Sequence, residues 1–195
     1  MTKFTSNYLI EVAQIANLIS VETVEQTIDL LFKVKSQGGR LFILGVGGSA
    51  ANASHAVNDF RKLAEIETYA PTDKVSEITA RTNDEGWKNV FSPWLKTSKL
   101  SSLDCIFILS VGGGDKERNI SANLCDAVDY ANSVGANITG IVGRDGGYTA
   151  KFANPVIIIP TVSNEFVTPF AESFQQIIWH LMVSHPKLKT NPTTW

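Results

Sequence analysis

The sequence is short of cysteine, of net charge and of long apolar runs, and each shortage excludes a class of protein. Only Cys105 and Cys125 occur among its 195 residues, which indicates buried thiols in a reducing compartment rather than a disulfide framework. The 17 Lys and Arg against 19 Asp and Glu leave a net charge of −2, so no basic excess is present to bind nucleic acid. No apolar stretch reaches about 18 residues, so no membrane span is expected.

The length and composition of the chain indicate one domain. Residues 1–7 lack a charged region followed by an apolar core, which predicts a cytoplasmic protein without a secretory signal. A length of 195 residues is enough for one domain with its own core, and no linker, repeat or low-complexity segment interrupts it. We therefore expect a single domain over 1–195 that ends in a loose tail over 186–195.

The most informative stretch covers residues 41–59, where an apolar run leads directly into a glycine-rich turn. Gly47, Gly48 and Ser49 end that run, and an Ala-rich segment follows, which is typical of a strand, a tight turn and a helix. Backbone N–H groups at such a helix start attract anions, and Ser49 can cap the helix or bind a ligand oxygen. Turns of this kind are also common scaffolding in α/β proteins. A dinucleotide site is disfavoured because Ala50 replaces the third glycine of its fingerprint.

Two pairs of potential ligands follow helical spacing. His55 and Asp59 lie four residues apart on one helix face, so they suit either a metal or catalytic pair or an ordinary surface pair. Glu172 and His180 lie eight residues apart, a little over two turns, on a helix expected over 164–184. For these two, the structural alternatives are a solvated carboxylate and a polar side chain tucked into the packing.

The rest of the chain alternates apolar runs with segments of helical periodicity. After a first strand at 41–46, continuous apolar runs at 103–111, 136–143 and 155–160 predict buried strands with helices between them. This order predicts an α/β fold, a three-layer αβα sandwich around a parallel sheet with right-handed crossovers. Ligands of such sheets bind at the carboxyl ends of the strands, where the glycine-rich turns lie.

Two segments outside this alternation allow more than one interpretation. Residues 1–38 predict two helices that separate near Ser20, and these either cover a partner subunit or form a weakly amphipathic surface. Asn83 and Asp84 precede a helix expected around residues 90–95 and can serve as its N-terminal caps.

Together these features resemble the SIS (sugar isomerase) family of phosphosugar-binding domains, in particular its phosphoheptose isomerase branch. In that branch the first strand ends in Gly-Asn-Gly-Gly-Ser, and a helical His follows with an acidic residue four positions later. This sequence has Gly-Val-Gly-Gly-Ser at 45–49, then His55 and Asp59. The branch's Asn-Asp pair is matched by Asn83 and Asp84. The similarity covers nearly the whole chain.

Two later motifs extend the resemblance. The branch's Ser-Thr-Ser-Gly-x-Ser phosphate loop corresponds to Ser110, Val111 and Gly112 onward, and Ser121 matches its end. The branch's Gly-Arg-Asp-Gly-Gly turn is intact at 143–147. The order and spacing of these motifs, more than any one of them, make the resemblance specific.

The resemblance implies a flavodoxin-like SIS domain that converts sedoheptulose 7-phosphate to an aldoheptose 7-phosphate through an enediol, for surface-glycan heptose synthesis. It also implies a homotetramer with sites at subunit interfaces, to which the helices within 1–38 contribute, and one zinc per subunit. The implied zinc ligands are His55, Asp59, Glu172 and His180. Of these, we expect Asp59 to act as base and His180 as its acid partner. The implied substrate-binding residues are Gly47, Gly48, Ser49, Asn83, Asp84, Ser110, Val111, Gly112, Ser121 and Glu172.

Four departures from the branch's pattern bear on function. Val46 replaces an Asn that should contact the substrate, Asp59 is one methylene shorter than Glu, and Glu172 replaces a Gln. The phosphate loop loses two hydroxyl positions, to Val111 and Gly112, and gains about six residues, although its three consecutive glycines can still offer N–H groups to a phosphate.

These departures keep two alternatives open. In the rebuilt loop, Lys116 or Arg118 would supply charge for a phosphate, while Asp115 would oppose it. One alternative is a non-catalytic SIS module that binds a phosphosugar or a protein partner, similar to the replication-initiator-associating proteins. The other is an isomerase of a different sugar phosphate.

Overall fold

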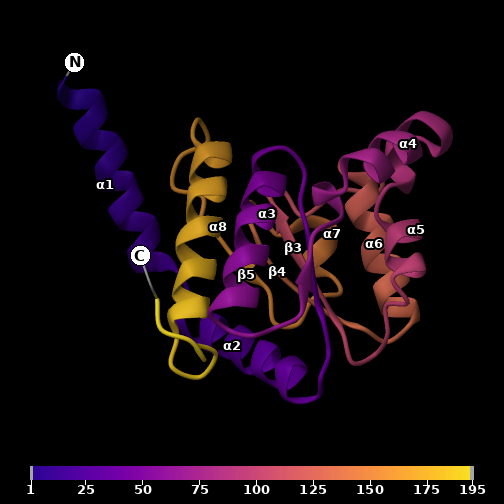
Figure 1. Cartoon of the computed structure of the whole chain (residues 1–195). Coiled ribbons are helices and arrows are strands. Elements are labelled where there is room, and N and C mark those ends of the chain that lie inside the picture. The colour runs from indigo at the N-terminus through magenta and orange to yellow at the C-terminus, as the bar shows by residue number, and fades with distance from the viewer. Residues whose placement is uncertain (1, 194–195) are drawn as a thin grey trace.

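The computed structural model describes residues 2–193 as a central sheet with helices on both faces (Figure 1). The strands are β1 (Leu41–Leu44), β2 (Thr68–Tyr69), β3 (Cys105–Ser110), β4 (Asn137–Val142) and β5 (Ile157–Ile158). The helices are α1 (Thr2–Leu18), α2 (Val21–Ser36), α3 (Gly48–Lys62), α4 (Val75–Glu85), α5 (Ser92–Thr97), α6 (Ala122–Ser133), α7 (Gly147–Ala150) and α8 (Val167–Ser184). Two short 3-10 turns are η1 (Pro71–Asp73) and η2 (Trp87–Asn89).

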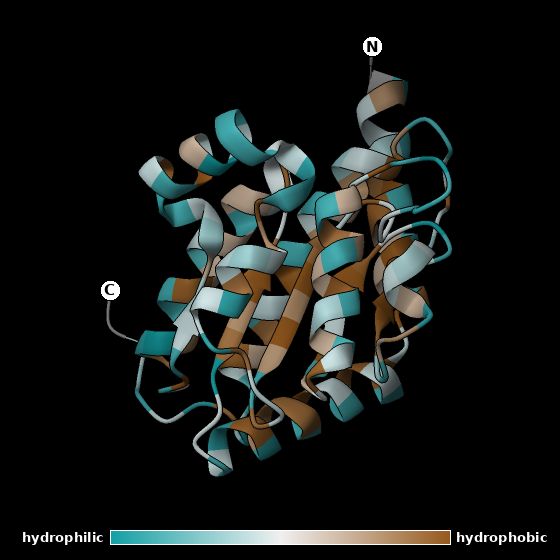
Figure 2. Cartoon of the chain, turned by 90° about the vertical axis from the view of Figure 1, so that its right-hand side faces the viewer, coloured by the Kyte–Doolittle hydropathy of each residue, from teal (hydrophilic) through white to brown (hydrophobic). Residues whose placement is uncertain are grey.

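All the pairings in the sheet are parallel, and the strand order is β2-β1-β3-β4-β5. This is the flavodoxin-like order of doubly wound folds. Every residue of β1 and β3 is buried, as expected for strands that are covered on both faces. The predicted three-layer α/β fold is therefore confirmed, and Figure 2 shows the apolar sheet enclosed by helices. The two-residue strand β2 has no counterpart in the prediction.

Two apolar cores hold the layers together, one on each face of the sheet. The larger core joins the sheet to α1, α2, α3 and α8 and includes Phe60 and Trp179. The second core joins the sheet to α5 and α6 and includes Phe42 and Phe91. Fully burying a large apolar side chain contributes about 1.5–3 kcal/mol. Packing of this kind, rather than helix propensity, holds α3 and α8 side by side.

One buried ion pair ties the beginnings of β1 and β3 together. The Arg40 guanidinium donates to both carboxylate oxygens of Asp104, at 2.8 and 3.1 Å, and the Asp104 side chain is almost fully buried. Asp104 also accepts the backbone N–H groups of Arg40 and Ser101. Burial raises the pKa of Asp104, but these hydrogen bonds outweigh it and hold the pKa below its ordinary value.

Both cysteines are buried and free, as predicted, with Cys105 in β3 and Cys125 in α6. Burial raises the pKa of each thiol, which makes both poor nucleophiles. In the part of the chain that the structure describes, no helix is both long and apolar enough to cross a membrane.

The two predicted N-terminal helices are present and separate at Ser20, whose hydroxyl accepts the N–H of Thr23 and caps α2. Helix α1 stands at one side of the molecule beside α8 (Figure 1). Its inner side packs on α8, where the rings of Tyr8 and Phe170 have centroids 4.7 Å apart. The helix also exposes large apolar side chains, those of Phe4, Leu9, Ile10 and Leu18.

The expectation that Asn83 and Asp84 cap a following helix is wrong. Both lie in the last turn of α4, where the Asn83 amide donates to the Asp84 carboxylate at 2.7 Å. Gly86, at a φ of +84°, follows as the C-terminal cap of that helix. The next regular helix, α5, starts after Phe91 without a side-chain cap.

The tail, expected to be loose over 186–195, is anchored to the domain through residues 188–191. Leu188 is fully buried in the larger core and anchors the segment. The backbone N–H groups of Thr190 and Asn191 both donate to the carbonyl of Leu63, at the C-terminal end of α3. The last two residues of the predicted tail lie outside the described residues.

Candidate active site

The first part of the site is the glycine turn between β1 and α3. Gly47, at a φ of +63°, is the N-terminal cap of the helix, and this left-handed conformation favours glycine. Ser49 lies instead in the first helical turn, only 1% exposed, and its hydroxyl has no hydrogen-bond partner among the described residues. A ligand oxygen at this helix N-terminus would satisfy the buried hydroxyl.

Glu172 reaches the same turn from α8. A Cβ atom added to Gly48 would lie 2.5 Å from a carboxylate oxygen of Glu172, so the carboxylate and the turn are in close contact. The positive end of the α3 dipole favours a negative charge there. The Asn52 amide joins the two helices by donating to the Glu172 carbonyl at 2.8 Å and to Gln175 Oε1 at 3.0 Å.

The glycine turns that follow β3 and β4 are interlocked. A Cβ on Gly113 would lie 1.9 Å from the carbonyl oxygen of Gly146, and one on Gly147 would lie 2.1 Å from the carbonyl oxygen of Gly112. The Ser110 hydroxyl accepts the N–H of Gly113 at 3.0 Å and shapes the first of these turns. Side chains at Gly113 or Gly147 would therefore force the two turns apart.

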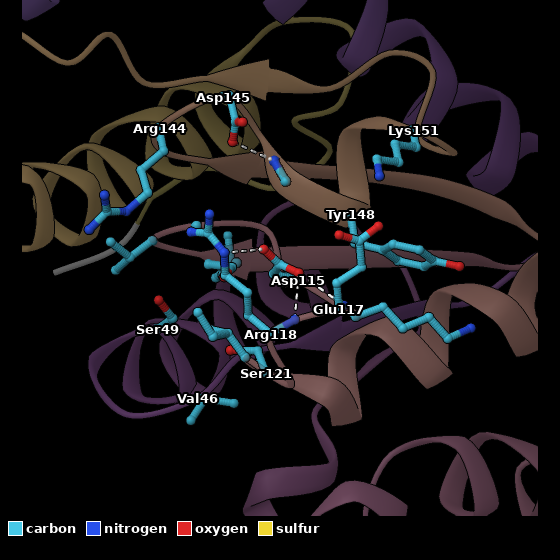
Figure 3. Close-up of a pocket in the computed structure, with 18 residues that line it drawn as sticks. Val46, Ser49, Asp115, Glu117, Arg118, Ser121, Arg144, Asp145, Tyr148 and Lys151 are labelled. Atoms are coloured by element: carbon cyan, nitrogen blue, oxygen red, sulfur yellow. Dashed lines mark hydrogen bonds and ion pairs between the residues drawn. The ribbon is translucent and has the colours of Figure 1, made fainter.

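A pocket of about 1100 Å³ opens at these turns, at the carboxyl ends of β1, β3 and β4 (Figure 3). Parallel α/β sheets bind ligands at this edge. The predicted binding residues that line the pocket are Ser49, Ser110, Val111, Gly112 and Ser121. Val46 lines it as well, at the position where the resembling branch has Asn.

The other predicted binding residues lie outside the pocket wall. Gly47 and Gly48 form the adjoining turn, and Glu172 contacts that turn. Asn83 and Asp84 are exposed on α4, at the upper right of Figure 1, and bond to each other. Within one chain the structure does not bring this Asn-Asp pair to the pocket.

The rebuilt loop after β3 folds back on itself. Asp115 and Ile120 form an antiparallel bridge with N–H···O distances of 2.9 Å in both directions. The Asp115 carboxylate accepts the N–H groups of Glu117 and Arg118 at 3.0 Å and lies 3.6 Å from the Arg118 guanidinium. The charge of Arg118 is therefore balanced within its own loop.

Lys116, the other cation expected to serve this loop, pairs with Asp129 on α6. The Tyr148 hydroxyl donates to the same carboxylate at 2.5 Å. Burial raises the pKa of Asp129, but these two hydrogen bonds outweigh it and hold the pKa below its ordinary value. The pocket also has two cations that are not among the predicted site residues, Arg144 and Lys151. The available signal for Arg144 is its place in the Gly-Arg-Asp-Gly-Gly turn at 143–147, which follows β4.

The second part of the site is a cluster of two histidines and an aspartate between α3 and α8. Asp59 Oδ2 lies 3.9 Å from His55 Nε2 and 3.6 Å from His180 Nε2. The Asp59 side chain is 14% exposed, whereas those of His55 and His180 are 51% and 41% exposed. The Trp179 ring packs beside both imidazoles, with centroids 4.8 Å from His55 and 3.7 Å from His180. The cluster thus packs against Trp179 on one side and is open to solvent on the other.

The donor set of this cluster suits a metal ion. Burial lowers the pKa of His180, the Asp59 carboxylate opposes this shift, and His55 adds to it. The lowered pKa favours a neutral imidazole, which has a free nitrogen lone pair. The ligand atoms of His55, Asp59 and His180 all lie within 4.8 Å of one another, and two imidazoles with a carboxylate are a zinc-type set with an open position. Glu172 is not part of this group.

The sheet order, the glycine turns at its carboxyl edge and the His-Asp cluster define an α/β domain with a polar ligand pocket and a candidate metal site. The family model for the SIS domain matches residues 7–143. The chain therefore belongs to the SIS domain family, and its relatives place it in the phosphoheptose isomerase branch.

Two curated relatives and one solved structure illustrate the likeness. The chain is 30% identical over 166 residues to the phosphoheptose isomerase of Syntrophotalea carbinolica, covering 83% of this chain and 79% of that protein. It is 34% identical over 167 residues to the lincomycin biosynthesis protein LmbN of Streptomyces lincolnensis, covering 80% of this chain and 59% of LmbN. The phosphoheptose isomerase GmhA from Neisseria gonorrhoeae shares the fold with a TM-score of 0.80, over 94% of this chain and 96% of that one, at 24% identity.

Proposed function

We propose that the protein is an aldose–ketose isomerase that interconverts sedoheptulose 7-phosphate and an aldoheptose 7-phosphate, for surface-glycan heptose synthesis. Its SIS domain and its relatives named phosphoheptose isomerase support this assignment. The observation that carries it is the cluster of His55, Asp59 and His180. Moving a carbonyl between C2 and C1 requires a base and an acid beside the same two carbons, and this cluster supplies both.

In the proposed mechanism Asp59 is the base. Its carboxylate takes a proton from C1 of the ketose while His180 gives a proton to the oxygen at C2, which forms the enediol. Asp59 then returns its proton to C2, and the hydroxyl proton at C1 passes to His180, which leaves the aldose. Each residue ends in the state in which it began.

We also propose one zinc ion per subunit, which His55, Asp59 and His180 would each hold through one atom. The second carboxylate oxygen of Asp59 and the second ring nitrogen of His180 would then be the atoms that transfer protons. The short distances among their ligand atoms support a metal there. When bound, zinc polarises a carbonyl oxygen as a Lewis acid. Glu172 remains a predicted fourth zinc ligand, and the support for it is the family resemblance.

The separation of the two parts of the site supports a substrate of this size. Ser49 and His55 are six residues apart on α3, which is roughly 9 Å of helix. An extended seven-carbon chain with its phosphate is on the order of 10 Å long, from C–C bonds near 1.5 Å. A phosphate bound at the glycine turn would therefore place C1 and C2 near the cluster.

We infer a cytoplasmic homotetramer with active sites at subunit interfaces. The exposed apolar side chains of α1 support an assembly, because contiguous apolar surface marks protein interfaces. Asn83 and Asp84 are the side chains that a partner subunit would bring to the site. The two free thiols support a reducing compartment. Analytical ultracentrifugation tests the assembly, and Leu9→Asp should dissociate it.

Metal analysis of the purified protein, combined with turnover of sedoheptulose 7-phosphate with and without a chelator, tests the function. We expect zinc to be present and Asp59→Asn to lower kcat at least about 10²-fold, since general acid–base catalysis contributes roughly 10²–10⁴-fold. Asp29→Asn is the matched control, because it removes the same charge from the exposed surface of α2. Full turnover by both Asp59→Asn and His180→Ala would refute the proposed pair.

A second candidate is the isomerisation of a different ketose phosphate. Val46 in the pocket wall and the rebuilt loop after β3 favour it, because both change the surface that meets the sugar. The 34% identity to LmbN, whose name differs from that of the phosphoheptose isomerases, also favours it. A panel of ketose phosphates of different chain lengths decides between the two candidates.

A further inference from the structure

Four cationic side chains line the pocket, and they differ in whether they have a partner. Lys116 and Arg118 are paired with carboxylates, and the Lys151 ammonium lies 5.8 Å from the centre of the Tyr148 ring. Arg144 makes no ion pair or side-chain hydrogen bond with any residue between 2 and 193. An arginine without a partner beside a pocket is available to an anionic ligand.

The position of Arg144 directs it to the same turn that the resembling branch uses for phosphate. It lies two residues after the end of β4 and has a φ of +54°, a backbone conformation that residues other than glycine rarely adopt. Its side chain lies across the turn after β3, with Cδ and Nε 3.5 and 3.8 Å from where a Cβ of Gly112 would be. In the resembling branch, a hydroxyl occupies the position of Gly112. The guanidinium therefore lies over a turn that has lost that group.

Unsatisfied donors of the same pocket lie on these turns. The Ser49 hydroxyl is buried without a partner, and within residues 2–193 no acceptor is found for the N–H groups of Gly112 and Gly114. Figure 3 shows Ser49 and Arg144 on the same side of the pocket. The neighbouring Asp145 already has a hydrogen-bond partner, because its carboxylate accepts the N–H of Gly147 at 3.1 Å.

We propose that Arg144 binds the phosphate of the sugar substrate, in place of the hydroxyls that the loop after β3 has lost. This inference rests on the proposed function, because it assigns the phosphate end of the same substrate. The phosphate oxygens accept from the Arg144 guanidinium, from the Ser49 hydroxyl and from the free backbone N–H groups of the glycine turn. Arg118, balanced by Asp115, contributes little direct binding.

Two matched variants test the proposal, Arg144→Asn and Arg118→Asn. Each removes one positive charge from the pocket, and asparagine tolerates the left-handed backbone at residue 144. We expect Arg144→Asn to weaken binding of inorganic phosphate about 10- to 100-fold in isothermal titration calorimetry at constant ionic strength, because charge-assisted hydrogen bonds have this weight. Arg118→Asn should weaken it by less than about threefold. Equal losses in the two variants, or no loss in Arg144→Asn, would overturn the proposal.

The same variants separate this proposal from the proposed function. If the parent protein binds phosphate through Arg144 but turns over no sugar phosphate, the anion site stands and the isomerase assignment fails. If it isomerises the sugar while Arg144→Asn leaves KM unchanged, the isomerase stands and the assignment of Arg144 fails. Arg144→Lys, which keeps the charge without the guanidinium fork, should bind phosphate with intermediate affinity and covers the case in which Arg144→Asn does not fold.

Discussion

Replacing Gly113 by alanine tests whether the two glycine turns at the pocket are interlocked. The added Cβ would lie 1.9 Å from the carbonyl oxygen of Gly146, whereas ordinary contact begins at 3.4 Å. The two backbones would have to separate by about 1.5 Å, and overpacking of this kind costs typically about 1–3 kcal/mol. Gly113 also has a φ of +68°, where an L side chain costs a further ~1–2 kcal/mol. We expect Gly113→Ala to lose about 2–5 kcal/mol of unfolding free energy.

Gly38→Ala is the matched control for this change. Gly38 has a φ of +71°, but an added Cβ would meet nothing within 4 Å, so only the conformational cost of ~1–2 kcal/mol applies. Urea unfolding of both variants gives the difference, which isolates the steric contribution of about 1–3 kcal/mol. Equal losses in the two variants would refute the close approach of the turns. Since the same turn forms the pocket wall, Gly113→Ala should also raise KM for the sugar phosphate.

Three further predictions concern acid, the tail and the metal. Because the folded-state pKa of Asp104 is depressed by Arg40, the stability from this pair is present above the unfolded pKa of about 3.9 and is lost as pH falls through the folded one. Urea unfolding across pH should show this loss, and Asp104→Asn should reduce it. Leu188→Ala should lower the free energy of unfolding by about 2–4 kcal/mol, since the side chain is fully buried. Unchanged thermal stability would mean that Leu188 does not anchor the tail to the core. Glu172→Ala should lower the zinc content, because the family resemblance implies Glu172 as the fourth ligand; unchanged zinc content would leave the ion to His55, Asp59 and His180.

The sheet could be predicted from the sequence because its strands are covered on both faces and read as unbroken apolar runs. Every residue of β3 is buried, for example, and the run at 103–111 predicts it within two residues at its start. By contrast, β2 is too short to show any pattern. Helix α4 buries none of its residues, so it has no apolar stripe to predict it, and the caps expected at Asn83 and Asp84 followed only local preference.

The site could be predicted where its chemistry follows local spacing. The four-residue interval of His55 and Asp59 and the glycine turns mark the two parts of the site on one helix. The charge pattern of the pocket could not be predicted in this way, because it depends on pairs between distant elements. Lys116 is balanced by Asp129 on α6, whereas Arg144 has no ion-pair partner among residues 2–193.

Helix α3 is held at both ends, so it keeps a constant distance between the two parts of the site. Its first turn contacts α8, and at its last turn the Asn191 amide donates to the Lys62 carbonyl at 2.9 Å. The distance from the glycine turn, which we propose binds the phosphate, to the cluster of His55, Asp59 and His180 is therefore fixed by the fold. In a sugar one carbon longer or shorter, the reacting carbons would lie on the order of 1 Å further along helix α3 or back from it. A misplacement of that size lowers the rate about 10²-fold. The fixed position of α3 would thus select substrates by the length of their carbon chain, without any side chain that binds the sugar's individual hydroxyls.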